Sequence, residues 1–210
     1  MSIPFPLIRH LSLQLTPVLA RLPVTPNQIT AASLMFGLAS AWLMMLEGWA
    51  MVGGVMLVLC YLLDNCDGEI AILKNQATKF GGHFDTFVDW IVHAAFFTAL
   101  GIGVADTTGN ALWLWLGWIA AAGGTVNYLL GLILDGHAGT PDAGDGPRQP
   151  KGIKDWVVYT FREMFRADFC FIVLVMAVFD LTWVLLPAGA IGAQVYWLLR
   201  LVHGAGDYHV

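Results

Sequence analysis

Four aspartates stand within stretches of sequence that are otherwise apolar enough to lie in a membrane. Asp64 and Asp67 fall near the end of one stretch, and Asp85 and Asp89 fall near the start of the next. An aspartate near the middle of a bilayer costs about 2.5–3.5 kcal/mol on insertion scales, so these groups need a compensating partner. Carboxylate oxygens suit hard divalent cations such as Mg²⁺ and Mn²⁺. The residue types therefore predict a metal site inside a membrane protein.

A site of this kind also indicates what it would act on. Mg²⁺ commonly binds a few carboxylates together with the phosphates of a substrate, so we expect chemistry on a phosphate or pyrophosphate. Gly68, Ala71 and Gly81 accompany the acids and would let a ligand approach the backbone. Close helix packing explains Gly68 and Ala71 equally well when they are taken alone.

Two helices must bring the acids together. Each residue of a helix advances by about 100°, so Asp64 and Asp67 share a face with the small residues that follow them, while Glu69 points elsewhere. Asp85 and Asp89 lie one turn apart on the next helix. A short turn between the two helices would make them antiparallel neighbours, so that both pairs of acids meet.

Composition sets the fold class. Of the 210 residues, 58% are hydrophobic and 12% are charged, whereas soluble proteins carry about 25% charged residues. Because a helix needs about 20 apolar residues to cross a bilayer, we expect one all-α integral membrane domain over residues 1–210, with about six transmembrane helices. The expected spans cover about residues 27–47, 50–74, 80–104, 110–135, 156–180 and 183–203.

Two further segments complete this single domain. Within residues 1–22, apolar residues are interrupted by Arg9 and Arg21, a pattern typical of an amphipathic helix at the membrane interface. Thr25 and Pro26 suit the N-cap and the first position of the following helix. Residues 136–154 contain repeated Gly and Pro, which predict a flexible loop.

The basic residues predict the orientation. With these spans, all 10 Lys and Arg residues fall on one side of the membrane, which the positive-inside rule places in the cytoplasm. The opposite side has Glu47, Asp106 and Asp180 as its charged candidates. We therefore expect cytoplasmic termini, a cytoplasmic 136–154 loop and a cytoplasmic site, in a bacterial or archaeal inner membrane.

The spacing of the acids and small residues resembles a known signature. The pattern DxxDGxxA followed by GxxxDxxxD is similar throughout to that of the CDP-alcohol phosphotransferase family, and the run TPNQIT at residues 25–30 resembles the usual opening of its first span. Six spans with cytoplasmic termini agree with that family. The seven signature positions are Asp64, Asp67, Gly68, Ala71, Gly81, Asp85 and Asp89.

This resemblance implies an enzyme of phospholipid biosynthesis. Such an enzyme transfers a substituted phosphate from a CDP-alcohol, such as CDP-diacylglycerol, to an acceptor hydroxyl and releases CMP. By resemblance, Asp64, Asp67 and Asp85 would bind two Mg²⁺ or Mn²⁺ ions. Asp89 would be the general base and would also touch metal. A carboxylate within reach of the hydroxyl can take its proton.

The resemblance also implies a donor pocket and partners. Gly68, Ala71 and Gly81 would line the cytidine pocket beside Asp67, with Asn27 as a polar contact. The partners would be the CDP-alcohol, a hydroxyl acceptor with or without a phosphate, and membrane lipid, with no nucleic acid. Family members are often homodimers, so a homodimer is expected here.

One position departs from the family pattern. Family members usually carry Arg directly after the alanine, and here Ile72 stands in that place. Loss of the guanidinium removes a bidentate phosphate partner, which Lys74 cannot fully imitate. Reduced activity, an altered donor and an engineered substitution all remain open explanations.

The residues around the signature are similar to the branch that makes inositol-phosphate-containing lipids. A phosphorylated acceptor would need a cationic pocket. Membrane topology and lipid headgroups explain the available basic residues equally well. These candidates are Lys151, Lys154, Arg162 and Arg166.

Two other functions compete with the enzyme. Intramembrane acids also form the path of divalent-cation transporters, although residues 105–210 show no second acidic motif. The second is a non-catalytic relative that binds a CDP-lipid, an alternative that the departure at Ile72 leaves open. His93 and Asn127 would either orient a ligand or, as is more common, bridge helices, and His83 would either join the site or pack at an interface.

Overall fold

The structure is a computed structural model that describes residues 6–135 and 167–203, and every regular element in those two ranges is a helix. In chain order the elements are α1 (Leu7–Ala20), α2 (Pro26–Met44), α3 (Ala50–Leu73), α4 (Lys79–Thr108), α5 (Leu112–Asp135), α7 (Phe169–Val178), the 3-10 turn η1 (Thr182–Val184) and α8 (Leu185–His203). The all-α fold class is thereby confirmed for the described residues.

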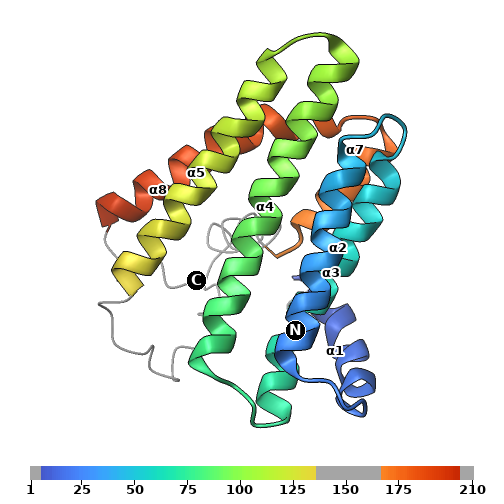
Figure 1. The fold of residues 1–210 in the computed structure, drawn as a ribbon, viewed down its shortest axis with the longest axis vertical. Helices are drawn as coiled ribbons and strands as arrows, with labels where there is room; N and C mark the ends of the chain where they lie inside the picture. Colours follow the sequence, from blue (N-terminus) through green and yellow to red (C-terminus); the bar gives the residue numbers. More distant parts are fainter. Residues whose placement is uncertain (1–5, 136–166, 204–210) are drawn as a thin grey trace, which may run out of the picture.

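The longest helix, α4, stands between two groups of helices. Its 30 residues make it about 45 Å long. On one side it packs against α2, which in turn packs against α3, and on the other side it packs against α5, which packs against α8 (Figure 1). The short α1 lies at the end of the bundle where α3 ends and α4 begins (Figure 1).

Three helices are long and apolar enough to cross a membrane, namely Ala50–Leu73, Lys79–Thr108 and Leu112–Ile133. The helices α2 and α8 have 19 residues each. In contrast, α7 has 10 residues, about 15 Å of helix, which falls short of a hydrocarbon core of about 30 Å. Among the described residues, three helices therefore have the length and composition of membrane spans, and the full set of six stays a prediction.

One predicted helix is interrupted, and another is slightly longer than predicted. The helix predicted over 156–180 is not continuous, because Ala167 and Asp168 are not helical and α7 begins only at Phe169. The helix predicted over 80–104 continues to Thr108, where Gly109 ends it in the left-handed region at φ 66°. The predicted loop at 136–154 lies outside the described residues.

Glycines let α4 approach its neighbours closely. A Cβ atom built on Gly101 would lie 3.1 Å from the Cα atom of Gly117 on α5, and one built on Gly103 would lie 2.9 Å from the Cα atom of Met45 after α2. Small residues at such crossings are typical of helix packing in membranes. Fully buried Phe96 and Leu100 of α4 fill the core beside these contacts. Thus α4 is held on both sides over its second half.

The helices α3 and α4 are neighbours joined by a short turn, as predicted, but side chains rather than close backbone packing connect them. The turn between them is short, with Asn75 at φ 53° and Gln76 donating to the carbonyl of Ala71 at 2.8 Å, as in a helix end with a left-handed cap. However, α2 packs along both helices, and α3 and α4 make few backbone contacts with each other. Side chains therefore bridge the space between α3 and α4.

Helix α1 is tied to the bundle at its first turn by a residue far away in sequence. The carboxylate of Asp168 accepts hydrogen bonds from the backbone N–H groups of Leu7 at 2.7 Å and Ile8 at 2.9 Å. The first N–H groups of a helix have no partner within the helix, and a negative charge there also interacts favourably with the helix dipole. Asp168 is 2% exposed, and its hydrogen bonds with these two backbone groups offset the cost of burying the carboxylate.

Helix α3 ties α1 in its middle and near its end. Glu69 accepts hydrogen bonds from Ser12, at 2.7 Å, and from Thr16. The ammonium group of Lys74 donates to the carbonyls of Leu22 at 3.0 Å and Val24 at 2.8 Å, which follow α1. Asp168, Glu69 and Lys74 thus hold α1 at its start, in its middle and just after its end.

Replacing Asp168 by Ala should loosen α1. Loss of a helix-capping acceptor costs about 0.5–2 kcal/mol, and here two donors lose their partner at once. We expect a lower melting temperature in detergent and faster trypsin cleavage after the exposed Arg9 of α1, located by mass spectrometry. Asp106→Ala, which removes an exposed carboxylate of α4, is the matched control and should change neither. An unchanged cleavage rate in Asp168→Ala would contradict the capping role.

Candidate metal centre

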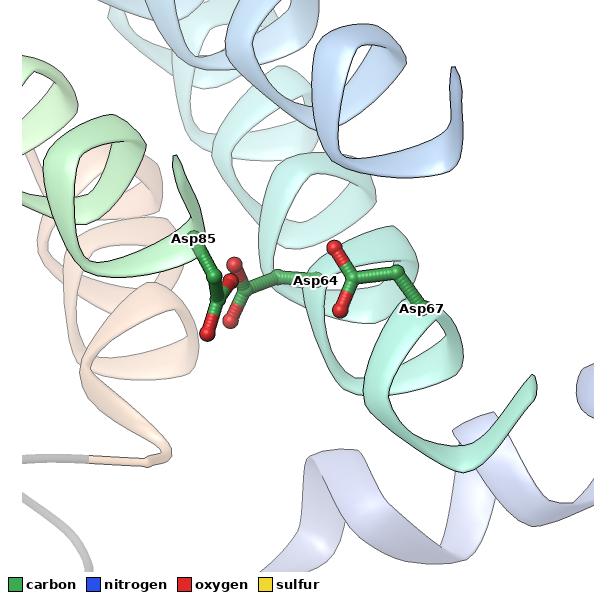
Figure 2. A group of neighbouring side chains, drawn as sticks. All are labelled: Asp64, Asp67 and Asp85. Carbon is green, nitrogen blue, oxygen red and sulfur yellow. The ribbon is translucent and has the colours of Figure 1, made fainter. Parts of the chain in front are cut away.

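Three of the four predicted aspartates converge. One carboxylate oxygen from each of Asp64, Asp67 and Asp85 lies within 4.8 Å of the others. Helix α3 supplies the first two and α4 supplies the third, and their carboxylates point toward one another across the space between the helices (Figure 2). Asp67 is 5% exposed, and the other two are half-buried. The predicted meeting of the two acidic faces is therefore found.

The chemistry of this cluster fits a divalent cation. Two unit negative charges about 4 Å apart repel each other by about 4 kcal/mol at an effective dielectric constant of 20. The Oδ1 atom of Asp85 is also buried and has no hydrogen-bond partner among the described residues. Buried carboxylate oxygens are normally paired or bound to metal. A hard cation would relieve the repulsion and satisfy this oxygen together.

Asp89 stands beside the cluster and outside it. It lies one turn further along α4, is exposed, and does not belong to the group of three whose oxygens lie within 4.8 Å. Its charge nevertheless acts on Asp64 and Asp85. This position suits contact with a substrate better than closure of the cluster. The predicted roles of Asp89 as metal ligand and base stay predictions.

The first turns of α2 face the cluster. Thr30 is 3% exposed, and its hydroxyl donates a hydrogen bond to Oδ2 of Asp67. One turn earlier, Asn27 faces Gly81 of α4, because a Cβ atom on Gly81 would lie 3.2 Å from the Asn27 Oδ1 atom. The structure thus brings together Asn27 and Gly81, which we predicted for one pocket, and places them next to the acids.

The small residues of the signature differ in their surroundings. Gly68 is exposed, and a Cβ atom built on it would meet nothing within 4 Å. Gly81 is crowded, since its Cβ atom would also lie 3.1 Å from the hydroxyl of Thr78, which caps α4 by accepting from the Gly81 N–H at 3.0 Å. Ala71 is half-buried on α3. Space for a ligand is therefore found at Gly68, whereas Gly81 serves close packing.

Other residues in the last turns of α3 pack against α1 and α2 and support the cluster. Cys66 and Ile70 are fully buried and form a small apolar core with Ile29 of α2. Glu69 binds α1 as described above, which confirms that it points away from the two aspartates of its helix. The prediction from the helical period, with Asp64 and Asp67 on one face and Glu69 on another, is therefore confirmed.

His93 bridges two helices, as the more common of its two explanations predicts. Its Nε2 atom lies 2.8 Å from the Tyr61 hydroxyl of α3, and its Nδ1 atom lies 2.8 Å from the backbone carbonyl of Asp89. A carbonyl only accepts, so a neutral ring carries its proton on Nδ1 and accepts from Tyr61 through Nε2. His83 is exposed on α4, and Asn127 lies in α5.

The cationic candidates contribute little to the described site. Lys74 is bound to the segment after α1, so in this structure it does not replace a missing guanidinium. Ile72 is 74% exposed, which leaves room for a longer side chain. The four residues predicted for a phosphorylated acceptor, Lys151, Lys154, Arg162 and Arg166, lie outside the described residues.

Sequence analysis missed two polar contacts of this region. The bond from Thr30 to Asp67 joins residues 37 apart, and that from Leu7 to Asp168 joins residues 161 apart. Thr30 closes the run at residues 25–30, which we noted only for its resemblance. Asp168 stands at the boundary of an apolar stretch, and no pattern in the sequence links it to the start of α1. Thr30 and Asp168 could therefore be noticed in the sequence, but their hydrogen-bond partners could not be predicted from it.

Known proteins are similar in sequence to this chain. The sequence model of the family described as CDP-alcohol phosphatidyltransferase matches residues 23–191. A curated relative from Aquifex aeolicus, named bifunctional IPC transferase and DIPP synthase, is 32% identical over 114 residues, which are 54% of this chain and 25% of the relative. Archaetidylinositol phosphate synthase from Pyrococcus horikoshii is 29% identical over 85 residues, or 40% of this chain and 45% of the relative. The chain therefore matches less than half the length of these relatives.

Replacing Asp85 by Asn should have opposite effects with and without metal. In EDTA the melting temperature should rise, because one of three mutually repelling charges is removed. Added Mn²⁺ should stabilise the wild type, by about 2.7 kcal/mol at a concentration 100 times the dissociation constant, and should stabilise the variant far less. Asp106→Asn is the control and should behave like wild type. Equal stabilisation of Asp85→Asn by Mn²⁺ would contradict a metal centre at this cluster.

Proposed function

The chain belongs to the CDP-alcohol phosphatidyltransferase family, and we propose that it transfers a substituted phosphate from a CDP-alcohol to an acceptor hydroxyl and releases CMP. The observation that carries this proposal is the cluster of Asp64, Asp67 and Asp85 across α3 and α4, with an orphaned buried oxygen on Asp85. Such a cluster suits a substrate that brings phosphate oxygens to a hard cation.

In the proposed reaction the acceptor oxygen attacks the phosphorus atom that carries the lipid alcohol. The bond from this phosphorus to the oxygen of the CMP phosphate breaks, and CMP leaves with that oxygen. Asp89 takes the proton of the acceptor hydroxyl, for which its exposed place beside the cluster is suitable. A carboxylate can take a proton only if an oxygen of it is not occupied by a cation. The position of Asp89 outside the group of three aspartates agrees with this requirement.

Two Mg²⁺ or Mn²⁺ ions are proposed at the cluster. Asp64, Asp67 and Asp85 would hold them, with Asp89 at the edge, and when bound they would neutralise the charge that develops on the pyrophosphate. The residues of the chain orient these ligands, since α3 is supported from behind by α1 and Asp67 is held by Thr30.

The cytidine end of the donor is proposed to lie along the small residues. Gly68 offers open space on α3, and Ala71 lies one turn further along. Asn27 provides an amide that can donate to and accept from a pyrimidine ring, and Gly81 lets it stand close to α4. The pocket would therefore be walled by the first turns of α2 and α4 and by the last turns of α3.

The donor is proposed to be CDP-diacylglycerol or another CDP-linked lipid alcohol, and the acceptor to belong to the inositol-phosphate branch. The names of the relatives support this branch, because one is an archaetidylinositol phosphate synthase and another is a bifunctional IPC transferase and DIPP synthase. Ile72, in place of the family arginine, removes one phosphate partner, so binding of the donor pyrophosphate would depend more strongly on the metal ions.

The membrane arrangement is proposed to have six spans, with the metal centre near the cytoplasmic face. The ends of α3 and the start of α4 would face the cytoplasm. The connections from α2 to α3 and from α4 to α5 lie at the other end of the bundle (Figure 1). Helix α1 would lie at the interface, because its exposed side carries Leu7, Leu11, Leu13 and Val18. A homodimer is proposed from family membership alone.

Asp89→Asn should abolish CMP release and leave Mn²⁺ binding within a few-fold of wild type. The assay is release of CMP from CDP-diacylglycerol with inositol phosphate or inositol as acceptor, in Mn²⁺ and in EDTA. Loss of a general base commonly costs about 10²–10⁴-fold in rate. A transporter or a non-catalytic binding protein would release no CMP in any of these conditions. Full activity of Asp89→Asn would show that another group takes the proton.

Gly68→Ala should weaken the binding of CMP without unfolding the protein. Both Gly68 on α3 and Gly124 on α5 have nothing within 4 Å of a built Cβ atom, and alanine favours a helix by about 1 kcal/mol over glycine. Both variants should therefore melt at or above the wild-type temperature. Only Gly68→Ala should raise the dissociation constant of CMP in calorimetry with Mn²⁺ present. Equal CMP affinity in the two variants would exclude Gly68 from the donor pocket.

A further inference from the structure

We propose that Thr30 is a positioning residue that sets the orientation of the Asp67 carboxylate for metal binding, an inference that rests on the proposed function. Thr30 belongs to α2 and is not one of the three aspartates of the cluster. Its hydroxyl donates to Oδ2 of Asp67, and both side chains are buried, with 3% and 5% exposure.

The hydroxyl proton of Thr30 belongs with Asp67 although two acceptors are near. The Thr30 oxygen also lies 3.1 Å from the backbone carbonyl of Pro26, but a hydroxyl has one proton to give. Hydrogen bonds to an ionised carboxylate are shorter and about twice as strong as those to a neutral acceptor. The Thr30 hydroxyl is therefore a donor to the metal-site acid.

An aspartate needs such a partner to hold a fixed orientation. Rotation about the bond to its carboxylate group has a broad profile, so the side chain alone does not define the plane of the two oxygens. When Thr30 holds one oxygen, that plane is set, and the direction in which Asp67 meets Asp64 and Asp85 is set with it. A neutral donor achieves this without adding a positive charge that would compete with a cation.

The support of Thr30 is itself rigid. Threonine is branched at Cβ, which restricts its χ1 angle. The start of α2 is fixed because the Gln28 side chain accepts from the Thr25 N–H at 3.0 Å, and the neighbouring Ile29 is buried against Cys66 and Ile70 of α3. Residues that hold metal ligands from behind commonly contribute about 10–100-fold to metal affinity.

The test compares Mn²⁺ affinities, measured by electron paramagnetic resonance of free Mn²⁺ on the purified full chain in detergent. Thr30→Val keeps the shape and removes the donor, and it should weaken Mn²⁺ binding about 10–100-fold. Thr30→Ser keeps the donor and should bind like wild type. The matched control is Ser33→Ala, one turn further along α2, which removes a fully buried hydroxyl that donates at 2.7 Å to the carbonyl of Thr30. It should leave the affinity unchanged.

Three outcomes would overturn the inference. They are wild-type affinity in Thr30→Val, weakened binding in Thr30→Ser, and an equal loss in Ser33→Ala, which would indicate a general effect on α2. If Thr30→Val does not fold, Thr30→Ala gives the same comparison. Absence of Mn²⁺ binding in the wild type would instead refute the proposed metal centre, so failure of the inference and failure of the proposed function are distinguishable.

Discussion

The repulsion among three carboxylates held within 4.8 Å of one another is the constraint on which this bundle depends. In a low-dielectric surrounding such groups separate or take up protons unless the helices hold them and a cation joins them. The helices do hold them, since α2 packs along both α3 and α4 while leaving these two without extensive direct contact. The space that the acids need is thereby kept open at a fixed width, and a side-chain bridge from Tyr61 to His93 spans it beyond the cluster.

Helix α3 divides its two faces between chemistry and support within a single turn. Asp67 faces the cluster, while Glu69, two residues later, binds two hydroxyl groups of α1. Both are acids in an apolar setting, but the hydrogen bonds of Glu69 hold α1, whereas Asp67 accepts from Thr30 and is directed at the cluster. The two signature glycines also differ in their surroundings, because Gly81 is enclosed by neighbouring side chains and Gly68 faces open space. The two glycines of the signature therefore have different structural roles.

Much of the candidate site could be predicted from sequence, because it follows from local periodicity. The helical period placed Asp64 and Asp67 on one face and Glu69 on the other, and Pro26 marked a helix start that the structure confirms. Contacts between distant segments could not be predicted in this way. No local pattern shows that α2 lies against both α3 and α4, that Thr30 meets Asp67, or that Asp168 interrupts an apolar stretch in order to cap α1. A hydroxyl and a carboxylate carry no sequence signal of their partner.

The bond between Asp168 and the start of α1 has a consequence for how the protein is made. Its two ends lie 160 residues apart at Ile8, and ribosomes add about 5–20 residues per second, so the N-terminal helix waits about 10–30 s before its cap is synthesised. During that time Glu69 and Lys74 emerge first and can anchor its middle and its end. The start of the N-terminal helix can therefore receive its cap only after most of the chain has been synthesised.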